Sequence, residues 1–123
     1  MKIPGFIARS FYVGGSLRNT ERGFEMQAQN PMGDGVLVGV GRMRVDDRDI
    51  DPATVTAQRP SDPEPLRAAD VSRMNPVHVT KGDRVTLHVD GEQLGPGEHK
   101  LEVELTELNL GQLAFAITDD IRP

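Results

Sequence analysis

The chain has 123 residues and a formal net charge of −5, and 37% of its residues are hydrophobic, which is enough apolar material for a core. A chain of this length can bury such a core as one domain, residues 1–123, without a metal ion or a disulfide. The acidic balance argues against nucleic-acid binding, which needs clustered Lys and Arg. The absence of cysteine excludes disulfides and thiolate ligands.

The amino-terminal segment MKIPGFIARSFYV carries a short apolar patch that Pro4, Gly5 and Arg9 interrupt. A signal peptide or a membrane span needs a longer continuous apolar run. We therefore expect a soluble, cytoplasmic protein that has no contact with a membrane. The same segment supplies the first predicted strand, 6–13, in which Tyr12 packs into the core with a hydrogen-bonded hydroxyl.

Strand signals continue along the rest of the chain, whereas apolar residues at helical spacing extend over one or two turns at most. The further predicted strands are 17–20, 23–29, 35–45, 53–57, 77–80, 84–90, 99–108 and 112–118, and turns at 31–35, 45–49, 80–83 and 90–97 separate them. This pattern predicts an all-β fold. The expected architecture is an antiparallel β-sandwich of jelly-roll or immunoglobulin-like type, with about 8–9 short strands and little or no helix.

Three stretches depart from a simple alternation of apolar and polar residues. The glycine-rich stretch 33–41 lies within a strand and does not open a helix, so it predicts bulges or close sheet packing and not a phosphate-binding loop. The segment 58–76 contains four prolines and predicts a long loop with one helical turn at 65–71, of a kind that is often functional. Apolar positions change phase between 101 and 117, which predicts a bulge or a strand that crosses between the sheets near Gly111.

The candidates for metal binding are His78, His88 and His99. Side chains alternate along the strand 99–108, so Glu102 and Glu104 point away from His99. No serine stands in a nucleophile elbow. We therefore predict no catalytic residue and no metal ligand in this chain, while a cross-strand site that combines His88 or His99 with carboxylates stays open as an alternative.

The order of the segments carries a family resemblance. The chain has a G-F-x-F-type strand at 23–26, a proline in the following turn at Pro31, a strand that closes on a V-D-D turn at 45–47, and an L-x-P-G-E-H-x-L-x-V hairpin at 94–103. In these features it resembles the small β-subunit domain of bacterial C-glycoside deglycosidases.

The resemblance implies a non-catalytic β-sandwich subunit that forms a hetero-oligomer with a larger TIM-barrel α subunit. That α subunit would hold a divalent metal, expected to be manganese, and the complex would cleave the carbon–carbon bond of 3-oxo-C-glycosides, a lyase reaction of carbohydrate metabolism. The chain itself would hold no cofactor. The candidates for the partner interface are Asn30, Pro31, Met32, Gly33, Phe115, Ile117 and Ile121.

Two alternatives belong to other classes of protein. A self-associating sandwich could serve as a binding or assembly module without a catalytic partner. A stand-alone metal-dependent enzyme would instead use the cross-strand histidine and carboxylate site. The neighbouring gene separates the first alternative from the subunit hypothesis, and the metal content of the purified chain tests the second.

Overall fold

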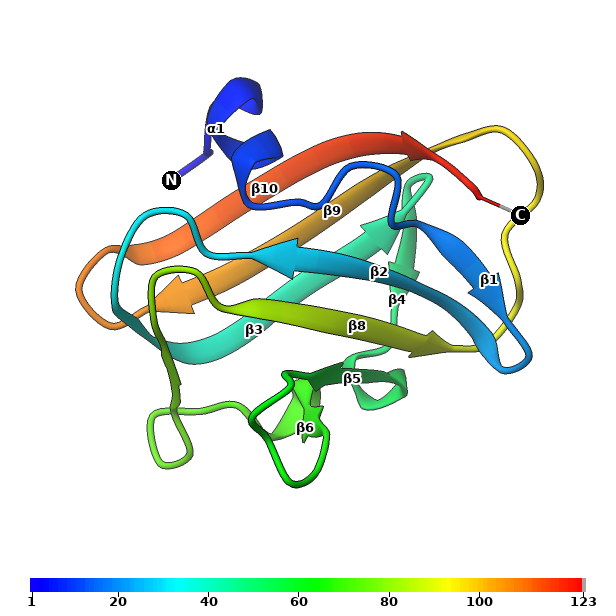
Figure 1. The fold of residues 1–123 in the computed structure, drawn as a ribbon. Coiled ribbons are helices and arrows are strands. Elements are labelled where there is room, and N and C mark those ends of the chain that lie inside the picture. The colour runs from blue at the N-terminus through cyan, green and yellow to red at the C-terminus, as the bar shows by residue number, and fades with distance from the viewer. Residues whose placement is uncertain (123) are drawn as a thin grey trace.

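The structure is a computed structural model that describes residues 1–122, and it consists of two antiparallel sheets packed face to face (Figure 1). In the first sheet, the neighbouring strands are, in order, β1 (Arg18–Thr20), β2 (Gly23–Gln29), β8 (Arg84–Asp90), β5 (Val55–Gln58) and β6 (Leu66–Arg67). In the second sheet they are β10 (Gly111–Asp120), β9 (Glu98–Glu107), β3 (Gly35–Val45) and β4 (Arg48–Ile50), and β7 (Val77–Val79) also pairs with β3. The predicted all-β sandwich is confirmed.

The strands β2, β3 and β8 begin and end at the predicted residues. Residues 1–122 form ten strands: eight of the predicted nine, together with β4 and β6, which are too short to give a sequence signal. The predicted long loop 58–76 contains β6 and a 3₁₀ turn, Ala68–Asp70, which lies within the predicted helical turn. A second 3₁₀ turn, Pro52–Thr54, precedes β5, and the Asp51 carboxylate caps it by accepting the Ala53 N–H.

The predicted strand 6–13 is wrong, because this segment begins with a helix, α1 (Gly5–Ser10). Pro4 precedes it, and the N–H groups of Ile7 and Ala8 donate to the Pro4 carbonyl. Ile7, Ala8 and Phe11 are wholly or partly buried at helical spacing, whereas the side chain of Phe6 is 80% exposed. Within residues 1–122, no helix has the length and apolar character to span a membrane.

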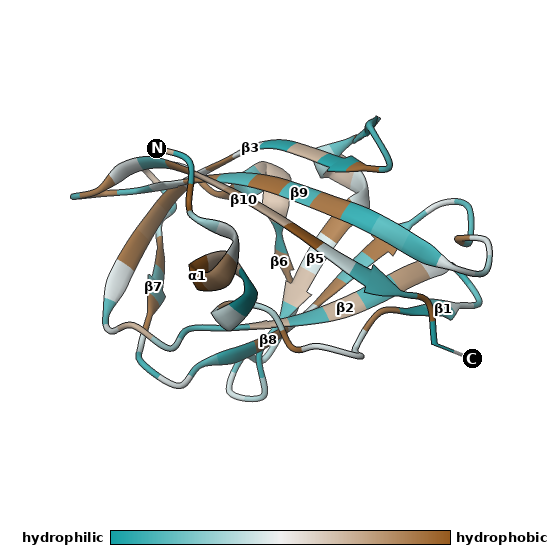
Figure 2. Ribbon diagram, turned by 90° about the horizontal axis from the view of Figure 1, so that it is seen from above, coloured by the Kyte–Doolittle hydropathy of each residue, from teal (hydrophilic) through white to brown (hydrophobic). Residues whose placement is uncertain are grey.

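The core lies between the two sheets, and alternate residues of each strand supply it. Figure 2 shows brown hydrophobic stretches between teal hydrophilic ones along the strands of both sheets. Leu17 is fully buried, and Phe24 pairs across the first sheet with Val89. The buried core cluster comprises Tyr12, Leu17, Phe24, Met43, Val45, Val55, Val89, Leu94 and Leu101.

The predicted irregularities of the second sheet are confirmed in one strand and wrong in another. Register shifts in β3 fall between Leu37 and Gly39 and between Val40 and Met43, as the glycine-rich stretch predicts. By contrast, β9 and β10 pair without a register shift from end to end. The change of phase that we expected to mark a bulge or a crossing strand is a three-residue hairpin turn, 108–110, which Gly111 closes with a φ of 79°.

The amino-terminal segment closes one open side of the sandwich, and Figures 1 and 2 both draw α1 beside β10. The Ile3 N–H donates to the Ala114 carbonyl of β10 at 2.8 Å. After α1, the Gln29 N–H of β2 donates to the Phe11 carbonyl, also at 2.8 Å. The segment therefore bonds to β10, an edge strand of the second sheet, and then to β2 of the first sheet, and its contact with β10 covers part of that edge.

Candidate functional site: the loop end of the sandwich

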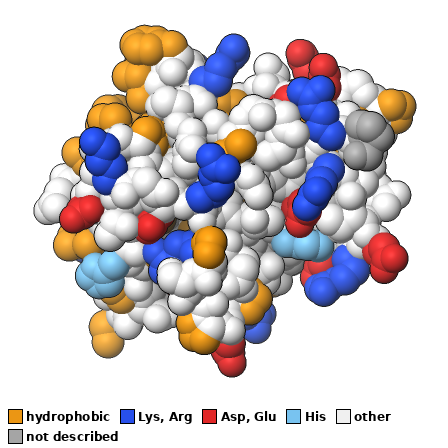
Figure 3. Space-filling model, viewed as in Figure 1, with side chains coloured by type: hydrophobic (Ala, Val, Ile, Leu, Met, Phe, Trp, Pro, Cys, Tyr) orange, Lys and Arg blue, Asp and Glu red, His pale blue; other side chains and the backbone are white. Residues whose placement is uncertain are grey.

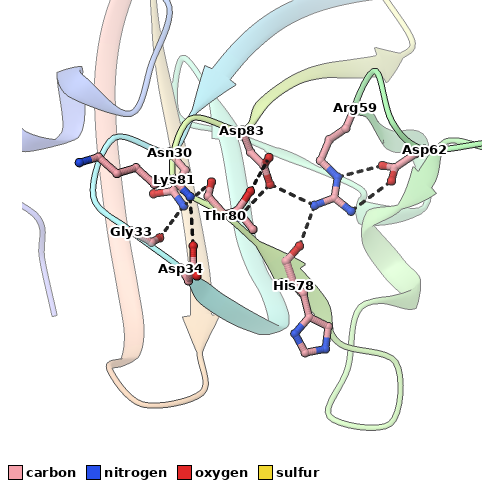
Figure 4. Close-up of polar contacts among 9 residues, drawn as sticks. All are labelled: Asn30, Gly33, Asp34, Arg59, Asp62, His78, Thr80, Lys81 and Asp83. Atoms are coloured by element: carbon pink, nitrogen blue, oxygen red, sulfur yellow. Dashed lines mark hydrogen bonds and ion pairs between the residues drawn. The ribbon is translucent and has the colours of Figure 1, made fainter.

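One end of the sandwich gathers the 30–34 loop between β2 and β3, the 80–83 turn between β7 and β8, and the hairpin turn 108–110. Asn30 organises the first of these loops. Its side-chain amide donates to the Gly33 carbonyl at 2.7 Å and to the Thr80 carbonyl at 3.0 Å (Figure 4). Its backbone N–H donates to the Asp83 carbonyl at 2.9 Å. Asn30 thus fixes the 30–34 loop against the 80–83 turn.

Arg59 fixes a third segment to the same turn. Its guanidinium makes a two-point contact with the Asp62 carboxylate at 3.0 and 3.1 Å and donates to the His78 carbonyl at 2.7 Å (Figure 4). It also contacts Asp83 at 3.4 Å. Asp83 in turn accepts the N–H and the hydroxyl of Thr80 at 2.9 and 2.8 Å. The start of the long loop is therefore tied to the β7–β8 turn.

These ion pairs keep their charges at neutral pH. The hydrogen bond from Arg59 holds the pKa of the Asp62 carboxyl below its usual range, although burial opposes this effect. The N–H and hydroxyl groups of Thr80 lower the pKa of Asp83, and the charge of Arg59 adds to the effect. Because the Arg59 side chain is only 19% exposed and that of Asp62 14%, we assign this pair a structural role at the base of the loop end.

Glu107 ends β9 and shapes the hairpin turn beside this network. Its carboxylate accepts the Val36 N–H at 2.9 Å and the N–H groups of Asn109 and Leu110 at 2.7 and 2.9 Å. These three donors, that of Val36 first, lower the pKa of Glu107. The carboxylate thus forms one wall of a shallow cavity of about 270 Å³, whose lining consists of Asp34, Gly35, Val36, His78, Val79, Thr80, Glu107 and Asn109.

Large apolar side chains surround this end without being covered. We call Met1, Met32, Leu108 and Leu110 the apolar loop patch; their exposed fractions are 66%, 69%, 48% and 62%. The Leu108 N–H donates to the Val36 carbonyl, and the nitrogen of Met1 donates to the Gln112 carbonyl, so β3, the hairpin turn and the amino terminus meet here. Figure 3 shows hydrophobic side chains along this margin of the molecule. Exposed apolar groups of this size often mark an interaction site.

The residues predicted for a partner interface fall into two groups that lie apart in the fold. Asn30, Pro31, Met32 and Gly33 form the β2–β3 loop, and of these Met32 belongs to the apolar loop patch. Phe115 is half-buried and packs edge-on against Phe11 at a ring distance of 5.3 Å, and Ile117 and Ile121 pack against the core. The interface role of all seven residues stays a prediction.

The three histidines do not come together. His78 is exposed, and His88 lies on the outer face of the first sheet, where its ring is 3.2 Å from the Thr20 hydroxyl and 3.5 Å from the Asp90 carboxylate. His99 lies at the start of β9, with its ring between Asp46 and the carbonyl of Gly95. Among the described residues, no three carboxylate or imidazole groups are placed to hold one metal ion. The cross-strand metal site considered from the sequence is not assembled in this part of the chain.

Sequence reasoning did not identify Arg59, Asp62, Asp83 and Glu107 as residues of the loop end. Two of the contacts have a local signal, since Arg59 and Asp62 are three residues apart, as are Thr80 and Asp83. Glu107 has no comparable signal, because its partner Val36 lies 71 residues away along the chain. Its role depends on the pairing of β3 with β9, which the sequence does not specify.

The model of a known protein family matches residues 7–122, which is nearly the whole chain, and its description is hydroxymethylglutaryl-CoA reductase, N-terminal domain. The chain belongs to this family. No curated protein shows significant sequence similarity to the chain. Assignment to the family of hydroxymethylglutaryl-CoA reductase N-terminal domains overturns the resemblance to the C-glycoside deglycosidase β subunit, so the lyase function inferred from it is wrong. The expectations of a larger partner, its TIM-barrel fold and its metal stay predictions.

The features that suggested a deglycosidase subunit are needed for the fold of this member of the reductase N-terminal domain family. In the 94–103 hairpin, Leu94 is a core residue and Gly97 has a φ of 104°, which favours glycine. At 23–26, Gly23 approaches the backbone of β8 and Phe24 is buried. Residues that satisfy such packing and turn requirements recur in unrelated sandwiches, so they identify an architecture and not an activity.

Proposed function

We propose that this chain is a docking module that packs against the catalytic part of a hydroxymethylglutaryl-CoA reductase through the apolar loop patch. The family assignment supports the choice of partner, because the family is described as the N-terminal domain of hydroxymethylglutaryl-CoA reductase. The observation that carries the proposal is the set of exposed apolar side chains held on fixed loops at one end of the sandwich. The proposal retains the larger partner and the cytoplasmic setting expected from the sequence, and cell fractionation would test the setting.

The hydrogen-bond network beneath the patch favours binding. Asn30 fixes the loop that carries Met32, and Glu107 fixes the turn that carries Leu108 and Leu110. A surface that is already ordered loses less conformational entropy when it binds, so more of the gain from apolar burial remains as affinity. Full burial of one such side chain contributes about 1.5–3 kcal/mol.

The experiment measures the affinity of the purified chain for the reductase catalytic part from the same organism by isothermal titration calorimetry. We expect a stable complex with the wild-type chain. Met32→Asp and Leu108→Asp should each raise the Kd at least about tenfold, because a charge at the centre of an apolar contact must be desolvated. The matched control is Met74→Asp, since Met74 is 95% exposed and lies outside the patch.

Three outcomes would contradict the proposal. The first is the absence of a complex with the wild-type chain. The second is a complex that both patch variants form with unchanged affinity. The third is a wild-type chain that light scattering shows as a homo-oligomer, and whose patch variants become monomeric, since a second copy would then occupy the patch.

A further inference from the structure

His99 connects three segments at the end of the sandwich opposite the apolar loop patch. Its Nδ1 lies 2.5 Å from the carboxylate of Asp46 in the β3–β4 turn, and its Nε2 lies 2.7 Å from the carbonyl oxygen of Gly95 in the 91–97 loop. The histidine side chain is only 11% exposed. Both of its partners are acceptors, so both ring nitrogens must donate. Only the protonated imidazolium carries two N–H groups.

The surroundings of His99 favour that charged form. The hydrogen bond that the ring donates to Asp46, followed by the one that it donates to the Gly95 carbonyl, raises the pKa of His99, whereas burial and the charge of Arg48 oppose the shift. On its own strand, His99 lies between Glu98 and Lys100. From β10, Asp119 occupies the paired position, and its carboxylate accepts the Tyr12 hydroxyl and the Gly15 N–H.

Asp46 is itself held in place from both sides. Burial raises the pKa of its carboxyl, but the hydrogen bonds from His99 and from the Lys100 N–H outweigh burial and keep the pKa below the usual value. The Asp46 N–H also donates to the Lys100 carbonyl at 2.9 Å. The carboxylate therefore stays with β9 whatever the protonation state of the ring.

The 91–97 loop contributes to the core, so its attachment has structural consequences. Leu94 is 94% buried, and its N–H and carbonyl both bond to the Asn19 side chain at 2.8 Å. The Gly97 carbonyl accepts the Ile121 N–H at the end of β10. Gly95 lies between these two anchors, and its carbonyl contacts the ring of His99.

We propose that His99 is a pH-operated clamp, which as an imidazolium holds the 91–97 loop to the β3–β4 turn and which releases the Gly95 end of the loop when it loses its proton. The neutral ring keeps its one N–H on the Asp46 carboxylate, because a charged acceptor forms the stronger hydrogen bond. The lone pair of Nε2 then faces the Gly95 carbonyl oxygen, and the two repel each other. The hydrogen bond between His99 and the Gly95 carbonyl is fully formed below the ordinary histidine pKa of about 6.5. It is lost as the pH rises through the raised pKa of His99.

The test is an NMR titration of the full-length chain from about pH 6 to 10, which spans both histidine states. We expect both ring nitrogens of His99 to be protonated at the acidic end. The amide signals of residues 94–97 should then shift with the same midpoint as the ring. Asp46→Asn should move both midpoints to lower pH while keeping the turn, since asparagine tolerates the φ of 50° found at this position.

Two controls separate the clamp from general effects of pH. His99→Gln should remove the shared transition of residues 94–97, and His78→Gln should leave it unchanged, because His78 is exposed and its backbone carbonyl makes the contact with Arg59. The proposal would be overturned if the loop signals ignored the titration of His99, or if a neutral ring were found at the acidic end. The titration of the wild-type chain tests the proposal even if a variant does not fold.

Discussion

At the scale of single residues, Gly23 has the strictest steric requirement. A Cβ atom at this position would lie 2.0 Å from the Val89 carbonyl oxygen, and the φ of 154° disfavours other residues. Gly23→Ala must therefore separate β2 from β8, and we expect it to lower the free energy of unfolding by about 3 kcal/mol. Urea denaturation followed by circular dichroism measures this change. Gly14→Ala is the control, because no atom outside its two chain neighbours lies within 4 Å of its Cβ position. An equal loss in both variants would contradict the steric argument.

At other positions the sequence predicted the environment of a side chain but not its distant partner. The burial of Tyr12 and the bonding of its hydroxyl are confirmed, although the partner, Asp119, lies 107 residues away. The predicted turn at 45–49 is also confirmed, with Asp46 and Asp47 at φ values of 50° and 66°. The sequence places His99 on the apolar face but does not reveal Asp46 as its partner, because that contact requires β3 to pair with β9.

At the scale of elements, the β9–β10 hairpin depends on the charge of Glu107. Because its pKa is lower in the folded chain, its contribution to stability is present above the ordinary glutamate pKa of about 4.3 and is lost as the pH falls through the lowered value. Glu107→Gln should therefore lower the melting temperature at neutral pH. As the pH is lowered, the melting temperature of this variant should fall less than that of the wild-type chain. Thermal melts from about pH 2 to 7 measure both effects.

The matched control for this hairpin is Glu98→Gln, at the other end of β9, where the side chain is exposed. This variant should follow the melting curve of the wild-type chain at every pH. If Glu107→Gln melted like wild type at neutral pH, the three N–H groups that Glu107 binds would not depend on the carboxylate. The hairpin would then be fixed by β-pairing alone.

Strands were predicted correctly where apolar and polar residues alternate over a long stretch, and wrongly where the stretch is short. β2 and β8 are seven residues each and alternate cleanly, so their bounds are predicted correctly. The segment that contains α1 has only six helical residues, and its apolar positions fit either period over so short a stretch. In the carboxyl-terminal third, a hairpin turn shifts the phase of the apolar residues in the same way as a bulge would.

At the scale of the whole molecule, stability depends on contact between the two sheets. Leu17 has no exposed surface and lies in the core cluster that both sheets line. Leu17→Ala should cost about 3–5 kcal/mol, because it leaves a cavity that the surrounding strands cannot close. Leu110→Ala, at a 62% exposed position, should change stability by less than about 0.5 kcal/mol. Urea titrations of both variants check this, and equal losses would show that the core is not close-packed at Leu17.

The architecture of the whole molecule is predictable from the sequence, whereas its function is not. Frequent strands and turns predict two antiparallel sheets. The loop end could be predicted only in part. The 30–34 loop carries Met32, but Leu108 and Met1 are brought to this end by backbone hydrogen bonds between segments that are distant in the sequence. The family assignment depends on similarity spread over residues 7–122 and not on one short motif.

The closure of the sandwich by its amino-terminal segment has a consequence for synthesis of the protein. The nitrogen of Met1 bonds to Gln112, 111 residues further along the chain, and Phe11 packs on Phe115. On the ribosome, the first segment therefore emerges long before β10, the strand it covers. Until β10 leaves the exit tunnel, the flank that the amino-terminal segment covers stays open, so the sandwich closes only after β10 has been synthesised.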